Sequence, residues 1–512
     1  MAGNRGSMAA DVSSPGIAPG GLPHEAAIRS GTDMLRTLAV AAGLACSVLF
    51  VVVGLGYQLQ LYGDGSLFSY AVAVRDAWAF HWHNISARLF VYLFSLLPAE
   101  TYVGLTGDAR GGIALYGFLF FAAPLLGLAA TFVADRSKGR IIFVYACFST
   151  ALLCPLVFGF PTEMWIAHAL FWPTLTLAHY ARSGIGGTAL VLAAMLALVL
   201  THEGALIFAA AIVATLLLRG ARDAAFVRAA VILLVAILVW AAVRVTFPAD
   251  EYFVKYFLRA AMNFFELNVF TNSDVLRLLL GTIASYAVVF FALRRLTAAN
   301  AHIYAASIIA AGLAVYWLWF DPTLHAVNRY YLRTLLVLAT PILGALAAVY
   351  ALAADGRLAL RVPLLSRLLA ARASGGAARA IAGALMLVLL VHAVETAKFV
   401  TAWANYKAAV RALAMGAASD PALGDPRFVS SDRIPADLNR LSWFSTTHFL
   451  SVVVAPNFSP ARLVVDRDAD FVWLSCETAT ANAEADRAVP AESRRLVRAH
   501  ECLHRRRRGP VR

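Results

Sequence analysis

The sequence predicts an α-helical polytopic membrane protein with about eleven transmembrane helices and a small C-terminal α/β domain outside the membrane. Three observations predict this fold class. Hydrophobic residues make up 61% of the 512-residue chain and charged residues only 14%, more apolar surface than a water-soluble domain of this size could bury. Long apolar runs recur along the chain, separated by short polar loops. Toward the C-terminal end the hydropathy falls, and short stretches typical of β-strands follow.

Residues 1–36 are rich in Gly, Pro, Ala and Ser, which predicts a disordered cytoplasmic tail. The apolar run after it, 38–57, is too long for the h-region of a secretory signal, and no convincing small-residue cleavage site follows it. We therefore expect an uncleaved signal-anchor helix that opens a transmembrane domain at 37–400.

Apolar runs long enough to cross a bilayer continue through this domain. The eleven expected helices lie at 38–57, 112–134, 141–158, 164–181, 187–202, 204–218, 228–247, 276–293, 302–320, 333–353 and 380–399. Leu89 to Leu97 is apolar but too brief to span, and we expect Pro98 to stop it. We interpret this piece as interfacial or re-entrant.

Lys and Arg gather in alternate loops, which are cytoplasmic by the positive-inside rule. These residues are Arg136, Lys138, Arg140, Arg182, Arg219, Arg222, Arg228, Arg294, Arg295, Arg357, Arg361, Arg367, Arg372 and Arg379. Loops 59–111 and 248–275 and the domain 401–512 then lie outside. The predicted location is a bacterial inner membrane, with the C-terminal domain in the periplasm. The net charge of +13 does not indicate nucleic-acid binding, because the basic residues fall in these loops and in the last few residues.

An outer segment between the seventh and eighth runs interleaves aromatic and basic residues at helical spacing, which suits a helix lying among lipid headgroups. We expect it to contribute a lipid groove; an ordinary aromatic belt at a helix end is the alternative. The residues are Tyr252, Phe253, Lys255, Tyr256, Phe257 and Arg259.

The C-terminal domain is predicted to contain strands at 427–431, 450–455, 462–466 and 470–474. Because the compartment outside the membrane is oxidising, Cys476 and Cys502 are candidates for a disulfide that pins the end of the chain.

Three short polar patterns fall on the outer side of this topology. The first is the Tyr62–Gly65 turn with Asp64, followed downstream by Arg88. The second is a pair of acids in very short turns, Glu163 and Glu203. The third opens the tenth helix and contains Arg329, Tyr330 and Arg333. Solvated turns and headgroup anchors at helix ends are the alternatives for each pattern.

This arrangement resembles the membrane-embedded glycosyltransferases of the GT-C superfamily. The resemblance implies that Asp64 is the catalytic or metal-linked carboxylate and that Arg329 with Tyr330 provides a cation for the donor phosphate. Many members have an Asp-X-Asp or an adjacent acidic pair, whereas this loop has one acid. No metal ligand is therefore assigned, and a divalent ion, Mg²⁺ or Mn²⁺, stays an open alternative.

Transfer of a sugar from a polyprenyl phosphate to a glycan, lipid or protein acceptor needs a base, a cation on the departing phosphate and a place for the prenyl chain. Asp64 is the candidate base, and Glu163 and Glu203 are candidates to orient the acceptor or complete the site. Arg88, Arg329 and Arg333 are candidates for the phosphate because guanidinium binds it bidentately.

Other functions remain open at this point. A secondary transporter or flippase of a lipid-linked or small anionic substrate is one alternative, although no internal repeat is visible. A polymerase or ligase of lipid-linked glycans and a non-catalytic membrane protein are others. The histidines lack the spacing of a zinc helix, and no nucleotide-binding Gly loop occurs. The sugar, the acceptor and the oligomeric state are not predicted.

Overall fold

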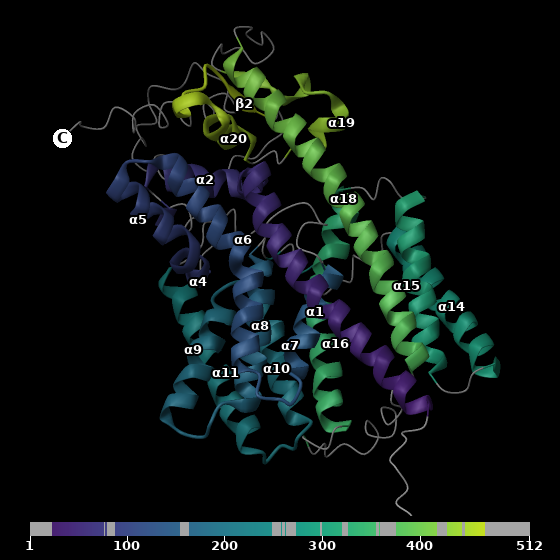
Figure 1. Cartoon of the computed structure of the whole chain (residues 1–512). Coiled ribbons are helices and arrows are strands. Elements are labelled where there is room, and N and C mark those ends of the chain that lie inside the picture. The colour runs from purple at the N-terminus through teal and green to yellow at the C-terminus, as the bar shows by residue number, and fades with distance from the viewer. Residues whose placement is uncertain are drawn as a thin grey trace, which may run out of the picture.

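The computed structural model describes residues 23–75, 77–78, 88–153, 163–247, 258, 262, 273–296, 300–319, 326–354, 358, 375–416, 428–442 and 446–465. A helix lies in each of the apolar runs expected from the sequence (Figure 1). These helices are α1 (Pro23–Tyr57), α6 (Ala109–Ala134), α7 (Ile141–Leu153), α8 (Met164–Tyr180), α9 (Ile185–Val199), α10 (Ala205–Leu217), α11 (Ala224–Thr246), α14 (Ser273–Leu296), α15 (Ala301–Trp319), α16 (Ala326–Ala354) and α18 (Gly375–Met415).

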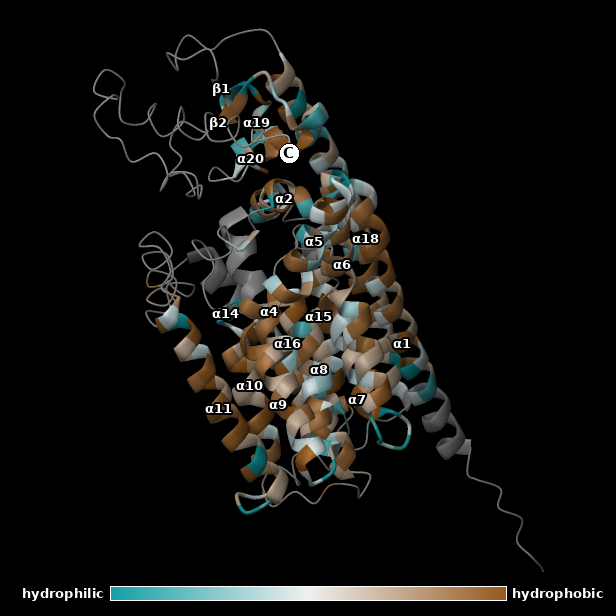
Figure 2. Ribbon diagram, turned by 90° about the vertical axis from the view of Figure 1, so that its left-hand side faces the viewer, coloured by the Kyte–Doolittle hydropathy of each residue, from teal (hydrophilic) through white to brown (hydrophobic). Residues whose placement is uncertain are grey.

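Within the described residues, six helical stretches are long and apolar enough to cross a membrane. They are Thr32–Tyr57, Leu89–Thr106, Ala109–Ala134, Ala224–Thr246, Val337–Ala354 and Gly376–Met415. Shorter apolar helices, α7, α9 and α10 among them, pack between these. Figure 2 shows hydrophobic residues over most of the helical bundle and hydrophilic ones concentrated in the loops at its lower end. These features are those of a helical membrane protein, while the number of helices that cross the bilayer stays a prediction.

The expectation that Pro98 stops a short apolar piece is wrong. A continuous helical stretch runs from α4 (Leu89–Val91) through the π-helical turn η2 (Tyr92–Leu96) into α5 (Leu97–Thr106). The proline lies in the first turn of α5, directly after the π turn. Because a π turn widens the backbone hydrogen-bond spacing, it accommodates the ring and the missing N–H of proline without ending the helix.

At two boundaries the helices also extend farther than the sequence predicted. Helix α1 begins at Pro23, so residues 23–36 are helical and do not belong to a disordered tail; proline is well tolerated in the first turn of a helix. Helix α18 continues to Met415 and has 41 residues, about 60 Å at 1.5 Å per residue. A bilayer core needs only about 30 Å, so α18 is longer than a membrane is thick, and residues 401–415, predicted to open the C-terminal domain, form its last turns.

Helix α1 packs against α6, α7 and α18. Small residues allow the closest crossings. A Cβ atom added at Gly43 would collide with the backbone of Cys147 on α7, and one added at Gly127 would collide with the backbone of Ala169 on α8. Close backbone approach at glycine is a common way for helices to associate where water supplies no hydrophobic driving force.

The described part of the C-terminal domain, residues 428–442 and 446–465, is called the appendage below. Its two strands, β1 (Phe428–Ser430) and β2 (Leu463–Val465), pair in parallel. Parallel strands need a crossover connection, and α19 (Ala436–Asn439) and α20 (Thr447–Val454) provide it. Two of the predicted strand positions, 427–431 and 462–466, are thereby confirmed, each as a strand of three residues.

The strand predicted at 450–455 is wrong, because this stretch belongs to α20. A short continuous apolar run does not distinguish a strand from a buried helix, and here the run forms the crossover that buries Phe449, Val452 and Val453 against the strands. The strand predicted at 470–474 and both cysteines lie outside the described residues.

The close crossing of α1 and α7 predicts a contrast between two glycines of α1. Alanine at Gly43 has to push the Cys147 backbone away, and overpacking of this kind costs about 1–3 kcal/mol. Alanine at Gly56, where a Cβ atom meets no neighbour, is expected to be neutral or slightly stabilising. Melting temperatures of the purified variants in detergent should fall for Gly43→Ala only. Equal melting temperatures would contradict the tight crossing.

Candidate functional site

Asp64 is the first residue of α2 (Asp64–Val74), a short helix that follows α1 through the 3-10 turn η1 (Leu59–Leu61). Glycine is required on each side of Asp64 for a different structural reason. Gly63 has φ 58° and ψ −134°, a conformation that side chains disfavour. A Cβ atom at Gly65 would collide with the Gln60 carbonyl. The Gly-Asp-Gly sequence thus builds a sharp turn that leaves the Asp64 side chain exposed in the first turn of a helix, where the helix dipole favours a carboxylate.

Arg88 lies immediately before α4 and holds two acids from elsewhere in the chain. Its Nε and one terminal nitrogen donate to the same carboxylate oxygen of Glu203, at 3.1 and 2.9 Å. Its other terminal nitrogen lies 3.3 Å from a carboxylate oxygen of Glu163. All three side chains are largely buried, with 12–14% of their surface exposed. The guanidinium therefore joins the N-terminal ends of α4, α8 and α10.

A second arginine reaches the same carboxylate. Arg244, in the last turn of α11, lies 3.6 Å from the other oxygen of Glu203, and its guanidinium stands over the ring of Trp240. His202 lies beside Glu203, but its Nδ1 accepts the backbone N–H of Gly204 at 2.9 Å. A nitrogen that accepts this bond cannot also donate to the carboxylate. We call Arg88, Glu163, Glu203 and Arg244 the Arg88 cluster.

The ion pairs of the Arg88 cluster keep Glu203 and Arg88 in their ionised forms. Burial alone would raise the pKa of Glu203, but the charge and the hydrogen bonds of the facing Arg88 outweigh burial and hold it at about 2. Burial alone would lower the pKa of the Arg88 guanidinium, and the nearby Glu203, Glu163 and Asp64 raise it above its ordinary value. Both partners are therefore ionised at neutral pH, and Asp64 lies within electrostatic range of Arg88.

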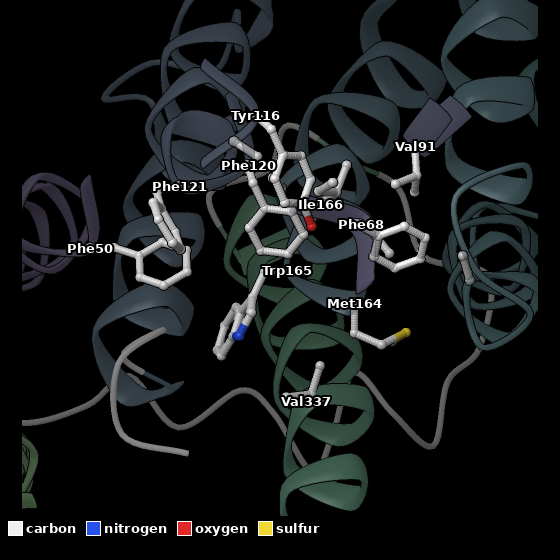
Figure 3. Packing of buried hydrophobic residues seen from close by; sticks show 14 of the residues in the cluster. Phe50, Phe68, Val91, Tyr116, Phe120, Phe121, Met164, Trp165, Ile166 and Val337 are labelled. Carbon is white, nitrogen blue, oxygen red and sulfur yellow. The ribbon is translucent and has the colours of Figure 1, made fainter. Parts of the chain in front are cut away.

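An aromatic layer lies next to these charges (Figure 3). Phe68 is one turn after Asp64, Val91 is one turn after Arg88, and Met164 directly follows Glu163; all three belong to one buried hydrophobic cluster together with Tyr116. Asp64 and Glu163 both act electrostatically on the Tyr116 phenol. The polar ends of four helices and the turn of α2 thus gather over one apolar base, at the end of the bundle that faces the appendage.

The structure brings together four of the predicted site residues: Asp64, Arg88, Glu163 and Glu203. It adds that Arg88 is paired with two carboxylates, Glu203 and Glu163, while the predicted role of Arg88 on a donor phosphate stays a prediction. Arg329, Tyr330 and Arg333 fall in the first turns of α16, and their side chains lie outside the described residues. The predicted lipid-groove residues also lie outside: Tyr252, Phe253, Lys255, Tyr256, Phe257 and Arg259.

Sequence reasoning missed Arg244 and Tyr116. Arg244 carried a usable signal, a cation in the last turn of an apolar helix on the same predicted side as Glu203. Tyr116 carried none, since a tyrosine in an apolar helix is usually a packing residue. Among the described residues, no group of three or more His, Cys, Asp and Glu side chains is close enough to hold a metal ion.

No family model, curated protein or solved structure matches the chain.

The contacts of Arg88 predict a large stability effect. Arg88→Gln leaves Glu203 and Glu163 buried with a weakened partner, and breaking a buried pair costs about 3–5 kcal/mol. The matched change Arg219→Gln removes one half-exposed i,i+4 pair with Asp223, which is worth about 0.5 kcal/mol. Denaturant titration in detergent should separate the two variants clearly. Similar unfolding midpoints for both would mean that the Arg88 cluster does not hold the helix ends together.

The pKa of Glu203 predicts how this stabilisation depends on pH. A carboxyl whose folded-state pKa lies near 2, below the ordinary 4.5, stabilises the fold above pH 4.5 and loses that contribution as the pH falls toward 2. The melting-temperature gap between wild type and Glu203→Gln should therefore be constant from pH 7 to pH 5 and should shrink at pH 3. A gap that is unchanged at pH 3 would contradict the assigned ion pair.

Proposed function

We propose that the protein is a membrane glycosyltransferase of the GT-C type that moves a hexosyl or pentosyl group from a polyprenyl phosphate to a glycan, lipid or protein acceptor. The observation that carries the proposal is an exposed carboxylate beside a buried ion-pair cluster. Asp64 begins α2 at the surface, within electrostatic range of Arg88, while Glu163 and Glu203 hold that arginine from largely buried positions.

Exposure supports Asp64 as the general base. Glu203, whose pKa the facing Arg88 holds at about 2, is a weak base near neutral pH. Asp64 is exposed in the first turn of α2, where an incoming hydroxyl can reach it. We therefore assign Glu163 and Glu203 to holding Arg88 and the surrounding helix ends, and Asp64 to the chemistry.

In the proposed reaction the acceptor hydroxyl gives its proton to the Asp64 carboxylate while its oxygen forms a bond to the anomeric carbon. The bond between that carbon and the phosphate oxygen breaks, and the polyprenyl phosphate leaves with the electron pair. A cation must stabilise this oxygen as negative charge develops. Because Glu163 and Glu203 already neutralise Arg88, we assign that task to Arg329 or Arg333, near the start of α16.

The proposed orientation places the Arg88 cluster and the appendage on the outer, periplasmic side of a bacterial inner membrane. At the opposite end of the bundle, the loops α6–α7, α8–α9 and α10–α11 contain six Lys and Arg residues, and the first turns of α11 add Arg228. The six are Arg136, Lys138, Arg140, Arg182, Arg219 and Arg222. The positive-inside rule places such an end in the cytoplasm, which supports this orientation and an arrangement of about eleven spans.

Asp64→Asn tests the assignment. The wild-type protein in proteoliposomes is offered hexosyl and pentosyl polyprenyl phosphates with envelope glycan and lipid extracts as acceptors, and release of polyprenyl phosphate is measured. Loss of a general base should slow release by about 10²–10⁴-fold. Asp437→Asn, which changes an exposed acid in the first turn of α19, should leave it unchanged. Full activity of Asp64→Asn would show that Asp64 is not the base. If the wild-type protein moves the donor across the bilayer without releasing polyprenyl phosphate, the result would favour a transporter.

A further inference from the structure

The appendage is attached to the bundle at the turn that carries Asp64. Ser66, in the first turn of α2, is fully buried, and its hydroxyl lies 3.1 Å from the backbone carbonyl of Thr446, directly before α20. The same hydroxyl lies 2.9 Å from the carbonyl of Gly63. One hydroxyl proton is thus shared between the carbonyl of Thr446 in the appendage and the carbonyl of Gly63, the residue before Asp64.

Two further contacts hold the appendage over α2 and α6. Farther along α2, the ring of Tyr70 packs on Phe449 of α20, with 5.2 Å between ring centroids. At the start of α6, Arg110 donates a hydrogen bond of 3.0 Å to the carbonyl of Ala455 and stands 5.0 Å from the ring centre of Phe458. The contacts come from separate parts of the appendage, so it is docked as a unit and not through one flexible point.

The geometry points to Ser66 as a positioning residue through which the docked appendage sets the orientation of Asp64. This inference rests on the proposed function for its catalytic consequence. Asp64 is exposed, and the residue before it is a glycine with φ 58° and ψ −134°, a backbone conformation that only glycine adopts readily. The buried Ser66 hydroxyl ties the carbonyl of this glycine to a segment that is far away in the sequence. Misplacing a reactive group by about 1 Å can cost about a hundredfold in rate.

The inference is tested with three variants of the full-length protein. Ser66→Ala removes the shared hydroxyl. Arg110→Met loosens the appendage from α6 without touching α2. Ser47→Ala is the control, because Ser47 is equally buried and donates to a carbonyl of its own helix, Gly43, but makes no contact with the appendage. Amide hydrogen exchange of peptides covering residues 58–68 is measured for each, together with release of polyprenyl phosphate from hexosyl and pentosyl polyprenyl phosphates.

Exchange in this segment should become about tenfold faster in Ser66→Ala and Arg110→Met and stay unchanged in Ser47→Ala. The turnover number should fall about tenfold in the first two variants while the KM for the donor stays constant, since a role in donor binding would raise KM.

Unchanged exchange in Ser66→Ala and Arg110→Met would overturn the coupling itself, whatever the protein's activity. Faster exchange with an unaltered turnover number would overturn the positioning role. If the wild-type protein releases no polyprenyl phosphate while exchange responds as expected, the proposed function is overturned and the structural coupling stands.

Discussion

A buried guanidinium has to be neutralised where it lies, and Arg88 imposes this requirement on the bundle. Leaving such a charge unpaired in a poorly solvated place costs several kcal/mol, so the fold has to bring carboxylates to it. Glu163 and Glu203 come from two different helical hairpins, and Arg244 from a third helix shares Glu203. These four residues lie far apart in the sequence. The Arg88 cluster therefore fixes where four helix ends meet, while apolar packing among helices would tolerate sliding and rotation.

The same constraint divides the work among the acids. Glu203 faces the buried arginine, which holds its pKa at about 2, and a carboxyl with so low a pKa is a poor proton acceptor near neutral pH. The charge of Arg88 still influences its surroundings, because Asp64 lies within electrostatic range of it. In the proposed reaction the general base is instead this exposed carboxylate at the start of α2.

Hydropathy predicted the helical bundle well because the length and period of apolar runs are local properties. Hydropathy failed where the local structure of a segment depended on another part of the chain. The π turn before Pro98 changed what proline does there, and the crossover between two parallel strands made a helix of the valine-rich stretch 450–455. The gathering of Asp64, Arg88, Glu163 and Glu203 on one side could be expected from the alternation of loops. Which acid pairs with Arg88 could not be expected, because that depends on the rotation and tilt of the helices.

The turn before Asp64 shows how strongly the structure restrains this part of the chain. On the side of α18, Trp403 and Lys407 both donate to the Tyr57 carbonyl at 3.0 and 3.1 Å, and Lys407 also holds the Gln58 side chain. These bonds satisfy the end of α1, whose last carbonyls have no partner within the helix. Tyr62 then packs edge-on against Trp403 and Phe399. Since α18 continues directly toward the appendage (Figure 1), one long helix anchors both the turn and the domain docked on it, and a change in its tilt would move the two together.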